Sequence, residues 1–232
     1  KNHRNHHPKA VWEKPPRGKR NKTMESNATD QLGEELHERK RNIDGAKAFL
    51  NAAPGPFDWS ADKLTKDIIN SLIQGEKVET RAFLRPMFKW CKGSDKEDGT
   101  MKALHFAEYV MLLSLEGDTS RGIPAQPQLQ PNYTYNTIIT SAQRANQNQW
   151  AKEAYDRIIE HGLNPDVFTS TALIDCLGRS GDSDEALKVY KRMQGTPAPP
   201  NVVTRVTLLR ALGANASPEN GHYEGAVLAV LA

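Results

Sequence analysis

The sequence has 232 residues, of which 38% are apolar and 25% are charged, and its formal net charge at pH 7 is +3. This length allows one large domain or two small ones. The sequence has no run of about 18 apolar residues, which excludes a membrane-spanning helix. Its two cysteines, Cys91 and Cys176, are too few and too far apart for a disulfide scaffold or a zinc finger. We expect both to be buried, reduced thiols.

The positive charge is concentrated at the N-terminus. Residues 1–22 hold eight basic side chains and one acid, whereas residues 133–202 hold seven bases and eight acids. Residues 1–30 contain several prolines and many charges but little to bury, so they are predicted to form a disordered basic tail. Three histidines lie in this tail, His3, His6 and His7. They lack ordered cysteine or carboxylate neighbours, so we predict no metal site there.

Residues 31–116 are predicted to be a helical region, because apolar residues recur there at helical spacing. Four helices are expected, at residues 31–50, between Ser60 and Gly75, at residues 79–92 and at residues 101–116. Ser60 can cap the second helix, and Pro54-Gly55-Pro56 stops the first. The polar segment Gly93–Gly99 is predicted to be a loop between the third and fourth helices.

A proline-rich connector is predicted at residues 117–132, after the helical region. No strand pattern of any strength is present before or after it. The short β-branched stretches fall within helical periodicity instead. The predicted fold class is therefore all-α.

The C-terminal part of the sequence repeats with a period of 35 residues. The segments YTYNTII, FTSTALI and VTRVTLL align, and they begin at Tyr133, Phe168 and Val203. A proline followed by Asp166 precedes the second segment, and a proline followed by Asn201 precedes the third. The predicted units are residues 133–167, residues 168–202 and a partial unit at residues 203–232.

Each unit is predicted to be a hairpin of two helices. In the second helices Ala151 and Ala186 occupy equivalent positions, as do Tyr155 and Tyr190. Small residues allow two helices to approach closely, and the aromatic ring fills the space toward the next hairpin. One such hairpin cannot bury its apolar face alone, so the units are expected to stack as an α-solenoid.

The repeats resemble the pentatricopeptide repeat (PPR) family. The resemblance depends on the 35-residue period and on three motifs, TYNTII at 134–139, HGLNPD at 161–166 and GDSDEALKVYKRM at 181–193. Tetratricopeptide repeats differ, because they have glycine where this sequence has Thr140, Asp175 and Arg210. The resemblance covers residues 133–202 best and extends into the partial unit. Residues 79–116 are a candidate degenerate repeat.

The resemblance implies that each unit reads one base of single-stranded RNA. In the family, the fourth residue of the first helix and the residue after the terminal proline choose the base. By position, Asn136 with Asp166 resembles a uracil reader, and Thr171 with Asn201 resembles an adenine reader. Short amide, hydroxyl and carboxylate groups can complement the edge of a base. The third unit has Val206 at the reading position, which cannot hydrogen-bond, so no base is assigned to it.

The resemblance also implies that Tyr133 and Phe168 stack against bases and that Arg144 and Arg179 contact phosphates. A stacked base contributes about 1–3 kcal/mol. Amphipathic spacing alone equally suits packing of the two aromatic rings between hairpins. The two arginines also suit the C-terminal ends of helices, where the helix dipole favours a cation.

Two functions remain open. The first is an organellar RNA-binding protein, in the mitochondrion or chloroplast, that acts without catalysis in RNA processing, stability or translation. The second is a structural scaffold subunit of a large organellar complex such as a ribosome, which binds mainly proteins. The few units, their neutral charge and the basic tail favour the second.

The organelle is implied by the resemblance, since no targeting peptide is visible. No cofactor, metal or small-molecule substrate is expected, because the sequence contains no catalytic or phosphate-cradling motif.

Overall fold

The computed structural model describes residues 22–52, 62–93 and 96–214. Four sequence predictions lie outside these residues, namely the basic tail up to Asn21 with its three histidines, the Pro54-Gly55-Pro56 stop, Ser60, and the end of the partial unit at residues 215–232. The chain divides into two compact units, residues 1–37 and residues 38–232.

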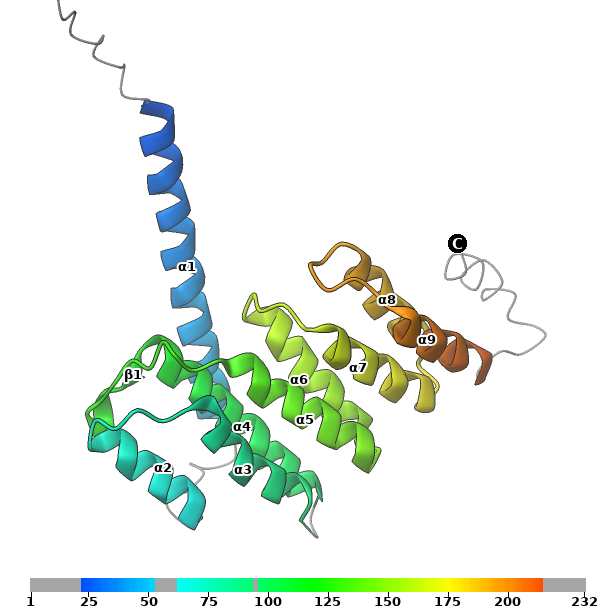
Figure 1. Cartoon of the computed structure of the whole chain (residues 1–232), viewed down its shortest axis with the longest axis horizontal. Helices are drawn as coiled ribbons and strands as arrows, with labels where there is room; N and C mark the ends of the chain where they lie inside the picture. Colours follow the sequence, from blue (N-terminus) through cyan, green and yellow to red (C-terminus); the bar gives the residue numbers. More distant parts are fainter. Residues whose placement is uncertain (1–21, 53–61, 94–95, 215–232) are drawn as a thin grey trace, which may run out of the picture. The chain divides into compact units, whose positions relative to one another are not determined.

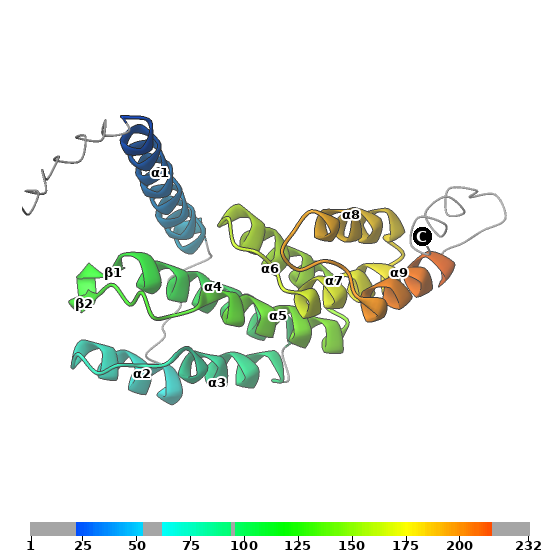
Figure 2. The ribbon, with the colours of Figure 1, turned by 45° about the horizontal axis from the view of Figure 1, so that its top comes forward.

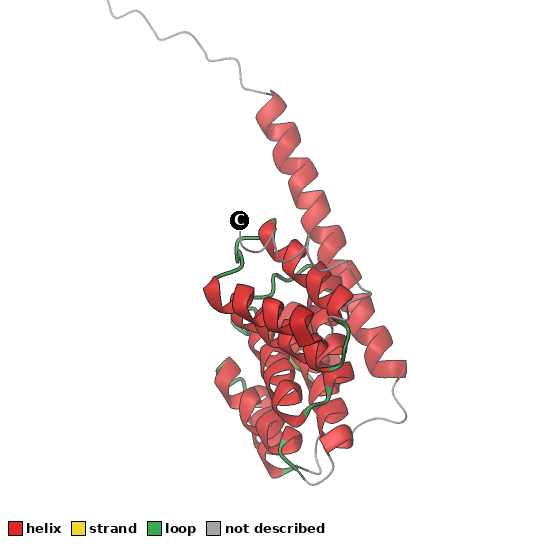
Figure 3. Ribbon diagram, turned by 90° about the vertical axis from the view of Figure 1, so that its right-hand side faces the viewer, coloured by secondary structure: helices red, strands yellow, loops and turns green. Residues whose placement is uncertain are grey.

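Nearly all of the described chain is helical, as Figure 3 shows. The helices are α1 (Lys22–Ala52), α2 (Lys63–Ile73), α3 (Thr80–Cys91), α4 (Lys96–Leu115), α5 (Pro131–Ala145), α6 (Asn148–Glu160), α7 (Val167–Arg179), α8 (Ser183–Gln194) and α9 (Val202–Ala214). The all-α fold class predicted from the sequence is confirmed. None of the described helices combines the length and the apolar character needed to cross a bilayer.

Helix α1 begins earlier than the sequence analysis predicted. It starts at Lys22 rather than near Gln31, so the assignment of residues 22–30 to the disordered tail is wrong. These residues are polar, which suggested a tail, but they include no glycine or proline. A helix already formed at residues 31–52 can therefore propagate through them, since adding a residue to a helix costs far less than nucleating one.

Asp62 and Gly75 determine where α2 begins and ends. Its N-cap is Asp62, whose carboxylate accepts a hydrogen bond from the Leu64 backbone N–H at 2.9 Å, so the predicted cap Ser60 is not the capping residue. Asp62 also pairs with Lys89 Nζ of α3 at 2.8 Å. Gly75 follows the C-cap with a φ of 75°, a left-handed conformation that glycine adopts at little cost, and it ends α2 as predicted.

The loop between α3 and α4 is shorter than predicted. Helix α4 begins at Lys96, so the last residues of the expected Gly93–Gly99 loop belong to its first turn. Gly99 has a packing role there, because a Cβ at this position would lie 2.2 Å from the Trp90 carbonyl oxygen. The first turn of α4 thus crosses directly over the end of α3. Phe83 and Met87 of α3 are fully buried.

A small structure that the sequence analysis did not predict lies in the connector. Strand β1 (Gly117–Asp118) pairs antiparallel with β2 (Ile123–Pro124) around the short 3₁₀ helix η2 (Thr119–Arg121). The Asp118 carboxylate accepts hydrogen bonds from Ser120 Oγ at 2.5 Å, Arg121 Nη1 at 2.5 Å and Tyr109 OH at 2.9 Å. Burial alone would raise the pKa of Asp118, but these hydrogen bonds outweigh it and lower the pKa to about 2.

The hairpins stack through their leading helices. Helix α3 contacts α5, α5 contacts α7, and α7 contacts α9, so these four helices form one row. The second helices lie behind this row, where α4 contacts α5 and α6, and α6 contacts α7. Figures 1 and 2 show α5, α7 and α9 side by side. This arrangement confirms the predicted stack of helix-turn-helix repeats.

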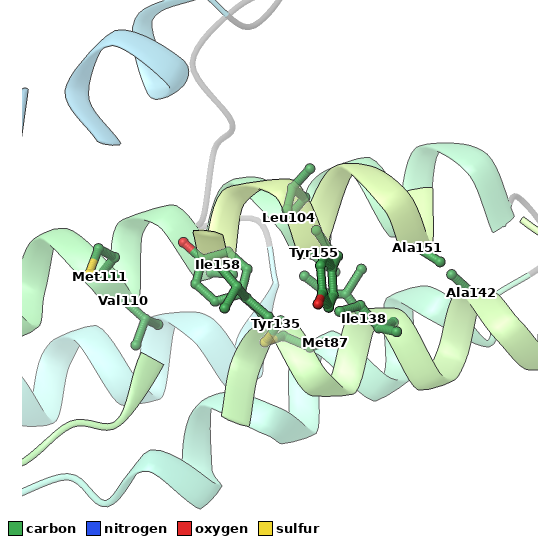
Figure 4. Close-up of a cluster of buried hydrophobic side chains, with 14 of the residues drawn as sticks. Met87, Leu104, Val110, Met111, Tyr135, Ile138, Ala142, Ala151, Tyr155 and Ile158 are labelled. Carbon is green, nitrogen blue, oxygen red and sulfur yellow. The ribbon is translucent and has the colours of Figure 1, made fainter. Parts of the chain in front are cut away.

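The core between the rows follows the repeat pattern. Ala151 and Ala186 are fully buried, and Tyr155 and Tyr190 are nearly so. Figure 4 shows Ala151 of α6 next to Ala142 of α5, where the two helices of the first hairpin come close together. Small residues at this crossing permit the close approach of the two backbones.

Candidate nucleic-acid interface

The leading helices bring one exposed apolar side chain from each unit to the same repeat position. Tyr133 of α5 is 52% exposed, Phe168 of α7 is 81% exposed and Val203 of α9 is 63% exposed. Packing between hairpins, the alternative role for the two aromatic rings, would require them to be buried. Large apolar groups exposed at a regular spacing are typical of a binding surface.

Asn136 and Asp166 lie together, although 30 residues separate them in the sequence. Asn136 Nδ2 donates a hydrogen bond to Asp166 Oδ2 at 3.0 Å. Asp166 is the N-cap of α7, and its Oδ1 accepts from the Thr169 N–H and from Thr169 Oγ1, both at 2.7 Å. Oδ1 of Asp166 therefore caps α7, and Oδ2 contacts Asn136 of the neighbouring helix α5. Asn136 Oδ1 accepts no hydrogen bond within the described residues.

Thr171 and Asn201 approach each other through a third residue. Asn201 Oδ1 accepts from the Thr204 N–H at 2.9 Å and from Thr204 Oγ1 at 3.1 Å, so Asn201 begins α9 as Asp166 begins α7. Thr171 Oγ1 donates to the Val167 carbonyl oxygen at 2.6 Å and lies 2.8 Å from Thr204 Oγ1. The two predicted reading residues both contact Thr204 and do not bond directly to each other.

The two predicted phosphate contacts differ in their surroundings. Arg144 is exposed and forms no ion pair within the described residues. Arg179 is held by protein groups, with Nη2 2.9 Å from an Asp175 carboxylate oxygen and Nη1 donating to Asn146 Oδ1 at 2.8 Å. Its Nη2 also donates to the Gln143 carbonyl oxygen at 3.0 Å, near the C-terminal end of α5. Arg144 is thus open to an anion, whereas Arg179 is already engaged by protein groups.

Asp175 joins three leading helices, which the sequence analysis missed. Its carboxylate accepts from Gln143 Nε2 of α5 at 2.8 Å and pairs with Arg210 Nη2 of α9 at 2.7 Å. Opposite charges at the same position of successive units, Asp175 and Arg210, were the signal that could have revealed this contact. Residues one repeat apart lie at the same place on adjacent leading helices, so opposite charges at these positions can pair. Opposite charges four residues apart pair in the same way within a single helix.

A buried polar cluster also escaped the sequence analysis. Glu108 of α4 is fully buried, and its carboxylate accepts from Arg157 Nε at 2.7 Å and Nη2 at 2.8 Å. Tyr135 OH donates to it at 2.9 Å, and His161 Nε2 lies 2.9 Å away. Burial alone would raise the pKa of Glu108, but the bonds to Arg157 and His161 outweigh it and hold the pKa below its ordinary value.

The same cluster holds the C-terminal half of α1. Arg157 Nη2 donates to the Gly45 carbonyl oxygen at 3.4 Å, and the guanidinium lies 4.8 Å from the centre of the Phe49 ring. Asn42 Nδ2 donates to the His161 carbonyl oxygen at 2.8 Å. The cluster ties α1, α4, α5 and α6 together through side chains that are buried or nearly so, which suits a structural role.

The described residues contain no group of three or more histidine, cysteine or acidic side chains that could hold a metal ion. Cys91 and Cys176 are buried free thiols, as predicted. Burial raises the pKa of Cys176 to about 11, which disfavours the reactive thiolate.

Comparison with known proteins agrees with this geometry. Residues 161–194, which span α7 and α8, match the family model described as PPR repeat. The chain is 38% identical over 61 residues to a chloroplastic pentatricopeptide repeat-containing protein of Arabidopsis thaliana, 35% identical over 78 residues to the small ribosomal subunit protein mL103 of the same plant, and 33% identical over 79 residues to a second chloroplastic pentatricopeptide repeat-containing protein. The resemblance noted in the sequence is thereby confirmed.

These matches are partial. They cover 26%, 34% and 34% of this chain, and only 7%, 19% and 16% of the respective relatives. The chain therefore spans less than a fifth of the length of these curated relatives.

Proposed function

We propose that this chain, which contains pentatricopeptide repeat sequence, binds single-stranded RNA in a mitochondrion or chloroplast and acts there in RNA processing, stability or translation. Its role would be recognition rather than catalysis. Two of the relatives named above are chloroplastic, which supports the organellar location.

One observation supports base reading most strongly. The pair Asn136 and Asp166, taken from the family pattern by position alone, forms a side-chain hydrogen bond between the two units that carry the exposed rings of Tyr133 and Phe168. A base placed between the rings would meet this pair at its edge. Uracil offers an N–H there, and the Asp166 carboxylate, whose Oδ2 faces Asn136, is an acceptor for it.

The number of units limits the affinity. Two stacked bases contribute about 2–6 kcal/mol in total, since one stacked base contributes about 1–3 kcal/mol. Residues 133–202 carry no net positive charge, so they add little phosphate attraction. Binding by these units alone would therefore be weak, and further contacts would have to strengthen it.

The test exchanges the second pair for the first. The double substitution Thr171→Asn with Asn201→Asp places the side chains of the uracil pair on α7 and α9. We expect the base preferred at this position to change from adenine to uracil, measured by fluorescence anisotropy with four RNAs that differ only there. The first position, read by Asn136 and Asp166, should keep its preference and serves as the internal control. An unchanged preference at the second position would contradict base reading.

The second candidate function is a scaffold subunit of a large organellar assembly such as a ribosome. The match to a small ribosomal subunit protein favours it, and so does the pairing of Arg179 and Arg210 with Asp175, which leaves few free cations on α7 and α9. The two functions differ in one measurement. A scaffold would shift no isolated RNA at moderate salt and would purify only with a large particle.

A further inference from the structure

A hollow of about 490 Å³ lies between the N-terminal ends of α3 and α5, and of its lining residues only Tyr133 has a role in the function proposed above. Lys77 and Arg81 line it from the α3 side, and Gln130 and Tyr133 line it from the α5 side. Thr80 Oγ1 accepts a hydrogen bond from the Gln130 N–H at 3.0 Å, which fixes the end of the connector against the start of α3. The hollow is therefore a built feature at a helix–helix contact.

Its position follows from the row of leading helices. Both α3 and α7 contact α5, so α5 lies between them (Figure 2). Tyr133 of α5 lines the hollow on the α3 side, while Phe168 is carried by α7. An RNA strand that follows the row past Tyr133 in the direction away from Phe168 would reach this hollow next.

Its lining suits a nucleotide. Lys77 and Arg81 are exposed, and neither forms an ion pair within the described residues, so both can meet a phosphate. Leu84 and the half-exposed ring of Tyr133 supply the apolar surface on which a base can stack. Glu79 also lines the hollow, and its carboxylate can accept from a ribose 2′-hydroxyl. The two cations outnumber this acid.

We propose that this hollow binds one further nucleotide, directly 5′ of the base assigned to Asn136 and Asp166. Its phosphate lies at Lys77 and Arg81, and its base stacks on Tyr133. The proposal rests on the RNA-binding function above and on the reading order that the resemblance to the repeat family implies, with the first unit at the 5′ end. Because cations and a ring face contact every base alike, this nucleotide is held without base preference.

The test uses the whole chain and two RNAs of equal length. Both contain uracil followed by adenine, with the extra cytidines placed 5′ of this pair in one RNA and 3′ of it in the other. We expect the 5′-extended RNA to bind about fivefold more tightly, as measured by anisotropy at fixed salt. The double variant Lys77→Ala with Arg81→Ala should abolish this difference and flatten the salt dependence of binding to the 5′-extended RNA.

The matched control is the double variant Lys191→Ala with Arg192→Ala, which removes two exposed cations from α8, in the other row of helices. It should keep the advantage of the 5′-extended RNA. Equal affinity of the wild-type chain for both RNAs, with the uracil–adenine preference intact, would overturn this proposal alone. An advantage that survives in the Lys77 and Arg81 variant would overturn it as well. Absence of any RNA binding would overturn the proposed function together with it.

Discussion

At the scale of single residues, Asp166 and Asn201 each serve two purposes. Each begins a leading helix, because its Oδ1 accepts a hydrogen bond from a backbone N–H in the first turn. The other terminal atom of the side chain remains for a neighbour or a ligand, and in Asp166 this atom meets Asn136. The cap fixes the side chain in one orientation, so the helix itself orients the group proposed to read a base.

Two substitutions separate these purposes. Asp166→Ala should lower the free energy of unfolding by about 1 kcal/mol and weaken uracil binding, because the cap and the base contact are lost together. Asp166→Asn should leave stability nearly unchanged, since asparagine caps as well as aspartate, but should weaken the preference for uracil. Urea denaturation and RNA anisotropy on the same samples measure the two effects. An Asp166→Asn variant that keeps the full preference for uracil would contradict a role beyond the cap.

Glu108 should matter for stability alone. Glu108→Gln removes the charge that compensates buried Arg157 while keeping the size of the side chain. We expect a loss of about 3 kcal/mol in the free energy of unfolding, because Arg157 then has only the exposed Glu160 as an ionic partner. Urea denaturation measures it, and Glu153→Gln on α6, the helix of Arg157, is the control, since Glu153 forms no ion pair within the described residues.

At the scale of elements, glycine sets the distance between α7 and α9. A Cβ at Gly178 would lie 2.3 Å from Ala211 Cβ and 2.8 Å from Ala211 Cα. The two leading helices can therefore pack so closely only because Gly178 has no side chain. Gly213 occupies the same position one unit later, 35 residues further along, where a Cβ would meet none of the described atoms within 4 Å.

These two glycines make a matched pair of tests. Alanine favours a helix interior over glycine by about 1 kcal/mol, but at Gly178 it must push α9 away. We expect Gly178→Ala to lower the free energy of unfolding by about 1–3 kcal/mol and Gly213→Ala to leave it unchanged or raise it slightly. Thermal unfolding followed by circular dichroism compares them. A stabilised Gly178→Ala variant would show that the two helices do not pack this closely.

Asp118 of strand β1 should make the free energy of unfolding depend on pH. The pKa of Asp118 is lowered in the folded chain to about 2 from its ordinary 3.8, so the folded state favours the charged carboxylate. Its contribution of about 2 kcal/mol is present above pH 4 and is lost as the pH falls toward 2. Asp118→Asn should reduce this acid dependence, measured by urea denaturation across that range. An identical pH profile in the variant would contradict the assignment.

At the scale of the whole molecule, the excess of basic side chains and the proposed base contacts lie in different parts of the chain. The leading helices carry the proposed base contacts on nearly neutral repeats, whereas residues 1–22 hold eight of the chain's basic side chains. Phosphate attraction is sensitive to salt, while stacking and base contacts are much less so. The tail should therefore raise affinity for any RNA without changing which RNA is preferred.

Neutralising the tail tests this separation. Substituting glutamine for the eight basic residues of residues 1–22 should flatten the dependence of log affinity on log salt, because each lost phosphate contact on a single strand lowers the slope by about 0.7. The preference for uracil and adenine should persist, as measured by anisotropy over a salt series. Loss of that preference in the variant would place recognition in the tail instead of the repeats.

The sequence by itself determined the fold class, the repeat period and the positions of the leading helices. These depend on local signals that recur, since apolar spacing marks each helix and a proline followed by Asp166 or Asn201 marks each unit. The exposed positions of Tyr133 and Phe168 carry the same period. For that reason the candidate site could be named residue by residue before any coordinates were known.

Only the tertiary structure decided which side chains are already engaged. It showed Arg179 bound by Asn146 of the preceding hairpin, and it brought Glu108 and His161 together across 53 residues. It also placed Lys77 and Arg81 beside Tyr133. Each of these contacts joins segments that are far apart in the sequence and are brought together by packing, so helical spacing within one segment does not predict them. Their partners depend on how helices with unlike sequences pack, which is a property of the folded chain.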